Sequence, residues 1–283
     1  MKKIAVITAI LGVAILQAQI WSLDQEESEE IRKTIGFSYP LKPKSLFIDN
    51  VFGYIHVKGG DGNQVILRTK KTIKARSRQK IERACREVKL EISEKDNAIE
   101  IFVDGPFRCP DRSLNWNCEK TGYMVQYDFD IQIPRKTDIF LKTVNNGDIE
   151  ISHLIGHFIV KNVNGKIRMS NITGSGRAHT VNGEVKVRFD KNPKASCSFQ
   201  TVNGDIEIFF PHKPSADFLV KTFNGEIYSA YDVRILPMAP TKPERINGRF
   251  VYKNNRFSAL RVGDGGTQIK MDTLNGDIII NQK

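Results

Sequence analysis

The sequence predicts an all-β protein, a repetitive β-solenoid with one short amphipathic helix in its N-terminal part. Two observations lead to this prediction. An Asn-Gly step followed by a charged residue and an alternating apolar stretch recurs along the chain, and a glycine returns every nine residues. Self-similarity at a fixed period indicates stacked, equivalent units. We take the glycines of the recurring step as structural turns: Gly147, Gly165, Gly183, Gly204, Gly225, Gly248 and Gly276.

The glycine spacing favours coils over hairpins. Gly147, Gly156, Gly165, Gly174 and Gly183 are each nine residues apart, as expected for a coil of about 18 residues with a turn at each half. A single Asn-Gly step would instead predict a hairpin, so a meandering hairpin sandwich is the alternative fold. After Gly183 the intervals widen to 21, 21, 23 and 28 residues, which indicates insertions in the later coils.

Within one unit, alternate side chains point to opposite faces of the strand. In the run from Asp205 to Ile208, the isoleucines are predicted to point inward and the carboxylates outward. At the corner, Gly permits positive φ and Asn tolerates it. The other inward positions are Ile149, Ile151, Ile167, Met169, Val185, Val187, Ile227, Ile278 and Ile280.

The N-terminus predicts export. Lys2 and Lys3 precede an uncharged apolar run, Ile4 to Leu16, and Gln17-Ala18-Gln19 offers a cleavage point, so residues 1–18 are expected to form a signal peptide. An uncleaved anchor or a buried helix is the alternative, but the run is shorter than the roughly 20 residues of a spanning helix. We expect a periplasmic, outer-surface or secreted protein with no transmembrane span after cleavage.

Three segments follow the signal peptide. Residues 19–40 include an acidic run and are expected to be a flexible N-terminal segment. Residues 41–135 are predicted to hold strands, a Cys loop and a helix over 74–90. The helical face would be Ile81, Ala84, Cys85 and Val88, at i, i+3, i+4 and i+7. Residues 136–283 are predicted to hold the solenoid repeats.

The repeats and the segments before them resemble the bacterial DUF4097 family, whose members are often named as adhesins. The resemblance rests on Ile55-His56-Val57, the helix, the segment Tyr127 to Pro134, the Thr-Val-Asn-Gly-Asp-Ile repeats and Val262 to Gly266, and covers roughly residues 40 to 281. It implies a β-solenoid and supplies no catalytic motif. The Cys loop departs from the family pattern.

The four cysteines are expected to be paired if the protein is exported. Cys109 and Cys118 flank a short polar loop, so we predict a local disulfide between them. Cys85 and Cys197 could form a long-range pair or remain two buried thiols. No CxxC pair or suitably spaced His supports a zinc site, and we expect neither metal nor other cofactor.

The outward carboxylates have both a catalytic and a structural interpretation. Asp205 and Glu207 share a face and could act on a polysaccharide. One coil after Asp148 and Glu150, however, the equivalent positions are Lys166 and Arg168, which favours charge ladders across neighbouring strands, with each pair giving roughly 0.2–1 kcal/mol. Glu184, Asp205 and Glu226 could attract Ca²⁺, but that ion needs about 6–8 oxygen ligands. We assign no catalytic or metal-binding residue.

A basic cluster is the best candidate for a functional surface. The formal charge of the chain is +11, and it stays at +9 without Lys2 and Lys3, which suits anionic envelope polymers or lipids. We predict an anionic-ligand surface, with a solvated helix as the plain alternative. Nucleic acid is not expected, because no aromatic platform accompanies the charge. The residues are Lys70, Lys71, Lys74, Arg76, Arg78, Lys80, Arg83 and Arg86.

Together these observations predict an exported, non-enzymatic β-solenoid that acts as an adhesin-like or scaffold binding surface in the bacterial envelope. Its partner would be an envelope protein or an anionic glycan or lipid surface. The main alternative is a regulatory envelope protein that binds a signalling partner. A carbohydrate-active β-helix enzyme is the weaker alternative.

Overall fold

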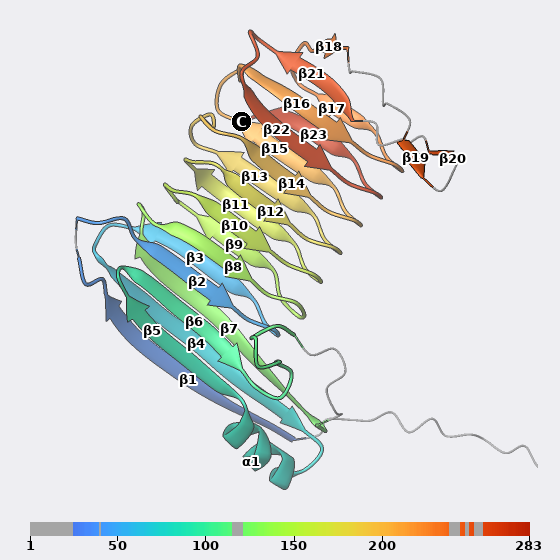
Figure 1. Cartoon of the computed structure of the whole chain (residues 1–283). Coiled ribbons are helices and arrows are strands. Elements are labelled where there is room, and N and C mark those ends of the chain that lie inside the picture. Colours follow the sequence, from blue (N-terminus) through green and yellow to red (C-terminus); the bar gives the residue numbers. More distant parts are fainter. Residues whose placement is uncertain (1–24, 40, 115–120, 238–243, 247–248, 252–256) are drawn as a thin grey trace, which may run out of the picture.

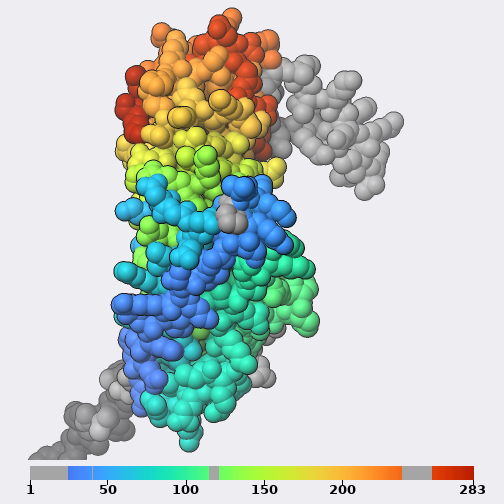
Figure 2. All heavy atoms as spheres, turned by 90° about the vertical axis from the view of Figure 1, so that its left-hand side faces the viewer, coloured from blue at the N-terminus to red at the C-terminus, as the bar shows by residue number. Residues whose placement is uncertain are grey.

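The fold is that of a computed structural model, which describes residues 25–39, 41–114, 121–237, 244–246, 249–251 and 257–283. Two long sheets, A and B, face each other in an elongated stack, with the C-terminal coils at one end and the N-terminal strands at the other (Figures 1 and 2). No helix in the described ranges has the length and apolar character to cross a membrane. The predicted signal peptide, residues 1–18, lies outside the described residues.

Sheet A has ten strands. In spatial order they are β1 (Gln25–Gly36), β4 (Gln64–Ala75), β7 (Tyr123–Pro134), β3 (Ile55–Gly60), β9 (Ile149–Ser152), β11 (Ile167–Ile172), β13 (Val185–Phe189), β15 (Ile206–Phe210), β23 (Ile278–Gln282) and β17 (Ile227–Ser229). The pairs β1·β4 and β4·β7 are antiparallel, and the other pairs are parallel.

Sheet B has eleven strands. In spatial order they are β18 (Arg234–Leu236), β21 (Ser258–Val262), β16 (Ala216–Lys221), β22 (Thr267–Asp272), β14 (Cys197–Gln200), β12 (Gly176–His179), β10 (Phe158–Lys161), β8 (Asp138–Lys142), β2 (Ser45–Asp49), β6 (Ala98–Asp104) and β5 (Lys89–Lys95). A helix, α1 (Arg78–Glu87), lies beside sheet A at the N-terminal end (Figure 1). β19 (Glu244–Ile246) and β20 (Arg249–Val251) form a separate pair.

The solenoid prediction is confirmed. From β7 to β17 the chain passes alternately from sheet A to sheet B, and each strand lies parallel to the strand one coil later. Ile149 pairs with Ile167, and Ile167 pairs with Val185, an offset of one 18-residue coil. Parallel pairing cannot arise from two-residue hairpins, which join antiparallel strands, so the hairpin sandwich does not describe this part of the chain.

The spatial order of the coils differs from their order in the chain. The coil formed by β2 and β3 lies between β6–β7 and β8–β9. Near the other end, the coil formed by β22 and β23 lies between β14–β15 and β16–β17. An early coil and a late coil are therefore each inserted between coils that are closer to one another in the sequence.

The core fills the space between the sheets and consists of the predicted inward positions. Ile206, Ile208 and Ile278 are fully buried, as are most of their equivalents, and burying such a side chain stabilises by about 1.5–3 kcal/mol. Ile227 is the exception, because β17 is the last strand of sheet A and leaves this side chain 37% exposed.

The recurring glycines are required mainly by close approach between coils. A Cβ on Gly183 would collide with the carbonyl of Gly165, and a Cβ on Gly204 with that of Gly183. The same collision with the preceding coil occurs at Gly147, Gly165, Gly225 and Gly276. Gly248 lies outside the described residues, and its role as a structural turn stays a prediction.

Asparagine recurs for a reason that the sequence analysis missed. Its side chains form a ladder, in which the amide nitrogen of each asparagine after the first donates to the amide oxygen of the preceding member at 2.6–2.7 Å. Among the described Asn-Gly steps only Asn146 has positive φ, at 59°, so tolerance of positive φ does not explain the others. The ladder order is Asn145, Asn164, Asn182, Asn203, Asn275 and Asn224.

The rest of the motif also bonds to the neighbouring coil. The hydroxyl of Thr201 donates to the carbonyl of Gly183 at 2.9 Å. The carboxylate of Asp205 accepts a hydrogen bond from the backbone N–H of Asp277 at 2.8 Å. Thr-Val-Asn-Gly-Asp is thus a set of contacts between coils. The asparagine contact recurs along the stack, and the aspartate contact recurs at Asp148, Asp205 and Asp277.

Two N-terminal expectations are wrong. The helix is shorter than 74–90, because Lys74 and Ala75 continue β4 and the Ser77 hydroxyl caps the first turn by accepting from the backbone N–H of Lys80. Cys85 is exposed and does not belong to the buried helical face. Residues 25–36, expected to be flexible, form β1, which pairs with β4 along its whole length.

Candidate ligand-binding face

The predicted basic cluster does not form one surface. Lys70, Lys71 and Lys74 lie on β4, Arg76 lies in the turn that follows, and Arg78, Lys80, Arg83 and Arg86 lie on α1. Lys70 and Lys71 are neighbours in a strand and therefore project to opposite faces of sheet A. The sequence predicted one helix over 74–90, and this prediction did not separate the residues of β4 from those of α1.

Carboxylates of β1 neutralise part of the same cluster. Lys74 pairs with Glu26 at 3.3 Å, and Arg78 pairs with Glu27 at 2.7 Å. The acidic run, expected to be a flexible segment, thus forms β1, which runs alongside β4 and reaches α1 through Glu27. These pairs are exposed, so each contributes at most about 1 kcal/mol.

A larger surface feature lies on the outer face of sheet A. It is a groove of about 820 Å³, which we call the sheet A groove. Six strands contribute to it, β4, β7, β3, β9, β11 and β13, and at about 4.8 Å per strand they span roughly 24 Å. Its polar lining includes His56, Lys58, Arg68, Asp130, Gln132, Glu150, Ser152, Arg168, Ser170, Glu184, Lys186 and Arg188.

Three cations of the groove have no carboxylate partner among the described residues: Lys58, Arg68 and Arg188. The guanidinium of Arg188 lies 3.8 Å from the ring centroid of Phe209, which holds it against the sheet. A further hollow of about 530 Å³ adjoins the groove and shares Arg68 and Asp130 with it. The groove therefore presents positive charge along its length.

The other charged residues of the groove form the ladder that the sequence predicted. Arg168 pairs with Glu150 at 3.3 Å, as expected, and also with Asp148 at 2.9 Å. Lys166 pairs with Glu184 at 3.8 Å, whereas its backbone N–H donates to Asp148. Lys186 pairs with Glu207. These carboxylates are satisfied by neighbouring strands.

A Tyr–Asp–His cluster lies at the β3–β7 side of the groove. Asp130 accepts hydrogen bonds from the Tyr54 hydroxyl at 3.0 Å and contacts His56 Nδ1 at 3.1 Å. Burial and the bond to Asp130 raise the pKa of Tyr54 to about 12. The other ring nitrogen of His56 faces Glu150 at 4.0 Å and not a hydroxyl or thiol. His56 thus lies between the carboxylates of Asp130 and Glu150, and the cluster continues the charge ladder across β7, β3 and β9.

The carboxylates considered for catalysis have structural partners. Asp205 accepts from the backbone of the next coil, and Glu207 accepts from the amide of Asn281 at 3.1 Å. No group of three or more His, Cys, Asp and Glu side chains in the described ranges is arranged to hold a metal ion.

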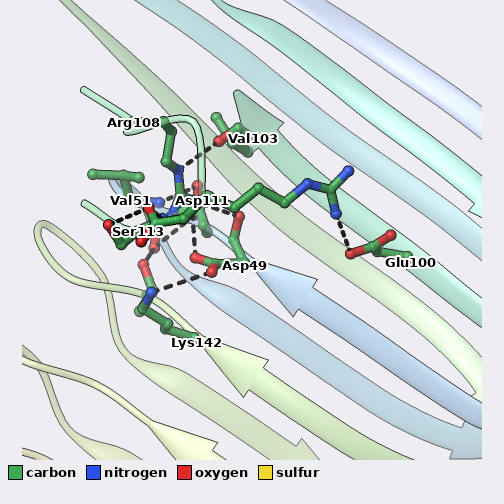
Figure 3. A network of polar contacts seen from close by, with 12 residues as sticks. Asp49, Val51, Glu100, Val103, Arg108, Asp111, Ser113 and Lys142 are labelled. Atoms are coloured by element: carbon green, nitrogen blue, oxygen red, sulfur yellow. Dashed lines mark hydrogen bonds and ion pairs between the residues drawn. The ribbon is translucent and has the colours of Figure 1, made fainter. Parts of the chain in front are cut away.

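The first part of the Cys loop is fixed to sheet B by Arg108 (Figure 3). Its side chain is only 2% exposed and donates to the Asp49 carboxylate at 2.9 Å and to the carbonyl of Val103 at 3.1 Å. Lys142 approaches the same carboxylate at 3.1 Å, and Arg112 reaches Glu100 at 2.7 Å. The loop is therefore docked by ion pairs centred on the buried Arg108 side chain, which nothing in the sequence pattern singled out.

The cysteine predictions have mixed outcomes. Cys85, Cys109 and Cys197 are free thiols within the described part of the chain, so Cys85 and Cys197 are not paired. Cys197 is buried but Cys85 is exposed, so they are not two buried thiols either. Cys118 lies outside the described residues, and its pairing with Cys109 stays a prediction.

Comparison with known proteins finds a family match in the coiled part. Residues 141–235 match the Toastrack DUF4097 family model. The Toastrack match runs from β8 to β18 and confirms the resemblance over this segment, which includes half of the groove-lining strands. No relative is found among the curated proteins.

Several solved structures resemble the chain. A "putative cell adhesion protein" of Clostridium sporogenes is 12% identical, with 91% of this chain and 100% of that chain covered and a TM-score of 0.40. A "putative adhesin" of Bacteroides fragilis is 14% identical, with 90% and 97% covered and a TM-score of 0.39. A "putative lipid binding protein" of Parabacteroides distasonis is 12% identical, with 93% and 98% covered and a TM-score of 0.30.

Proposed function

We propose that this protein is exported and acts without catalysis as a binding surface of the bacterial envelope, and that the sheet A groove binds an extended anionic ligand. The observation that carries the proposal is a set of three cations, Lys58, Arg68 and Arg188, that line a long open groove and pair with no carboxylate among the described residues. The export signal predicted for residues 1–18 supports the envelope location.

The chemistry of the groove fits a polymer with regularly spaced acidic groups. A solenoid presents the same outward positions at each coil, so its ligand contacts repeat at intervals of one strand, about 4.8 Å. The serines and the amide of the groove lining, Ser152, Ser170 and Gln132, could donate to or accept from hydroxyl groups between the charges. A polysaccharide bearing carboxylates has both kinds of group.

Retention on immobilised polygalacturonate tests the proposal. The double variant Lys58→Glu, Arg188→Glu should lose about tenfold or more in affinity, because two charge-assisted contacts become repulsive. The matched control Lys161→Glu, Lys194→Glu changes the net charge equally at exposed positions outside the groove lining and should retain binding. Equal losses in the two variants would show that only bulk charge matters and would overturn the assignment of the groove.

A variant of the predicted basic cluster provides a second test in the same experiment. Lys70 lines the hollow beside the groove, whereas Arg76 and Arg86 are exposed near or on α1. If Arg76→Glu, Arg86→Glu abolishes retention while the groove variant does not, the ligand binds at the helix, as the sequence predicted.

A further inference from the structure

Asn-Gly steps carry an intrinsic chemical lability. The backbone nitrogen of the glycine can attack Cγ of the preceding asparagine, forming a C–N bond, and the side-chain amide nitrogen leaves as ammonia with the proton lost by the glycine nitrogen. Water then opens the resulting succinimide by breaking one of its two C–N bonds, which leaves aspartate or isoaspartate. No electron transfer is involved, and water is the only co-reactant.

Four of the Asn-Gly steps are held against this reaction by hydrogen bonds. Each asparagine both donates and accepts within the ladder, so its amide group is fixed on two sides. The backbone N–H of the following glycine donates to a carbonyl of the next coil at 2.8–3.0 Å. The nucleophile and the carbon it must reach are therefore fixed separately. The four residues are Asn164, Asn182, Asn203 and Asn275.

Asn224 is held less firmly. It is the last residue of the ladder, so its amide nitrogen donates to Asn275 but its amide oxygen accepts nothing within the described residues. The backbone N–H of Gly225 likewise donates no hydrogen bond within them. The strand that follows, β17, is exposed at all three residues and is an edge of sheet A. Such edges open locally at low cost.

Asn146 is outside the ladder altogether. An extra residue in this unit places Asn145 at the ladder position and leaves Asn146 exposed, with φ of 59°. Its amide nitrogen has only a 3.7 Å contact with the sulfur of Met124. The backbone N–H of Gly147 donates no hydrogen bond to the described part of the chain.

We propose that Asn146 and Asn224 are sites of spontaneous deamidation in the folded protein, and that the ladder protects the four asparagines between them. Conversion at Asn224 replaces the donor that faces Asn275 with a carboxylate, so two oxygens meet where a hydrogen bond was. Conversion to isoaspartate also inserts a methylene into the backbone ahead of β17. Both products loosen the last coil, so the modification would mark the age of the folded protein at the end of its solenoid.

Peptide mapping by mass spectrometry tests the proposal. The folded protein is kept in mildly alkaline buffer, samples are digested under acidic conditions, and the Asn, Asp and isoaspartyl forms of each Asn-Gly peptide are quantified. We expect Asn146 and Asn224 to convert at least about tenfold faster than the other four, since the loss of one or two hydrogen bonds changes an opening equilibrium by about that factor. Asn247 lies outside the described residues, and its peptide is not used in the comparison.

Incubation of the same protein in concentrated urea is the control, because it removes the ladder and should bring all six rates close together. A ladder asparagine that converts as fast as Asn146 or Asn224 in the folded protein would overturn the proposal. Protection of all six in the folded state, with conversion only in urea, would overturn it as well.

Discussion

The amide of Asn275 donates a 2.7 Å hydrogen bond to the amide oxygen of Asn203, although 72 residues separate the two in the chain. The amide oxygen of Asn275 also accepts a hydrogen bond from Asn224 at the same distance. Asn275 therefore lies inside the ladder, and Asn224, which comes earlier in the chain, lies at its end. The late coil of β22 and β23 therefore stabilises both of its neighbours.

This position predicts unequal costs for two similar mutations. Asn275→Ala removes two ladder hydrogen bonds and should lower the free energy of unfolding by about 2 kcal/mol, whereas Asn224→Ala removes one and should cost about 1 kcal/mol. Urea denaturation of the two variants measures the difference. Equal costs would show that the ladder does not contribute to stability along the stack.

The glycine column predicts a larger effect. In Gly204→Ala the new Cβ would collide with the carbonyl of Gly183, so the coils must separate, and overpacking of this kind should cost about 3 kcal/mol. Gly36→Ala is the matched control, because nothing lies within 4 Å of its Cβ position. Its thermal midpoint should stay close to that of the unchanged protein, and a similar loss in both variants would argue against steric exclusion.

Arg108 and Arg112 allow a comparison of buried and exposed ion pairs. Arg108→Ala removes the bonds of the buried guanidinium to the Asp49 carboxylate and the Val103 carbonyl and should destabilise by about 2 kcal/mol, while Asp49 keeps Lys142 as a partner. The Arg112 side chain is 52% exposed beside Glu91, so Arg112→Ala should lower the free energy of unfolding by less than about 1 kcal/mol. Proteolysis within residues 105–114 should increase only in the Arg108 variant. If the two variants behave alike, the buried Arg108 side chain does not anchor the loop.

The ion pairs between β1 and the segment from β4 to α1 predict that a charge reversal on one side can be compensated by a reversal on the other. Lys74→Glu with Arg78→Glu places like charges against Glu26 and Glu27 and should accelerate hydrogen exchange of the β1 amides. Adding Glu26→Lys and Glu27→Arg reverses both signs and should restore slow exchange. The effect should shrink in high salt, because the pairs are exposed. Failure of the fourfold variant to restore protection would mean that charge does not hold the strand.

His179 predicts a loss of stability in mild acid. Burial, followed by the charge of Lys161, lowers the pKa of this histidine, and its Nδ1 is a buried atom with no hydrogen-bond partner. The unfolded chain therefore binds the proton first, so stability should decline as pH falls below the ordinary value of about 6.5. In the unchanged protein the urea midpoint should be lower below that pH than above it. In His179→Gln the difference between the two midpoints should shrink. The exposed His157→Gln should leave the decline unchanged.

The sequence predicted the coils because periodicity at nine and 18 residues reflects local geometry directly. The alternation of apolar and polar residues predicted which side chains point inward. Among the predicted inward positions only Ile227 is exposed, because it lies on the last strand of the sheet, and a single repeat does not show where the stack ends. The basic cluster is divided between β4, the following turn and α1, and within β4 the alternation of the strand puts Lys70 and Lys71 on opposite faces. Its neutralisation by Glu26 and Glu27 depends on a long-range pairing of β1 that no local pattern encodes.

The groove was missed for a related reason. Lys58 and Arg68 lie on β3 and β4, Arg188 lies far along the chain on β13, and each taken alone is an ordinary surface cation. Lys58 lies opposite Gln132 and Ser152, and Arg188 lies opposite Ser170 and Phe209, so neither meets a carboxylate on the neighbouring strands. Arg68 lies opposite Asp130, whose carboxylate is bonded to Tyr54 and His56. Both conditions depend on the register between strands. The positions Asp148, Glu150 and Arg168 were predictable as a ladder because their spacing of one coil is visible in the sequence.

The insertion of β22 and β23 between earlier coils has a consequence for biogenesis. During synthesis, β15 and β17 emerge before residues 267–282 that must separate them, so they can stack on each other through matching Asn-Gly steps. The late coil then has to displace that contact or arrive before it forms. A chain that emerges slowly from the ribosome or translocon therefore favours a shortened stack, and factors that keep the nascent chain unfolded favour the complete one.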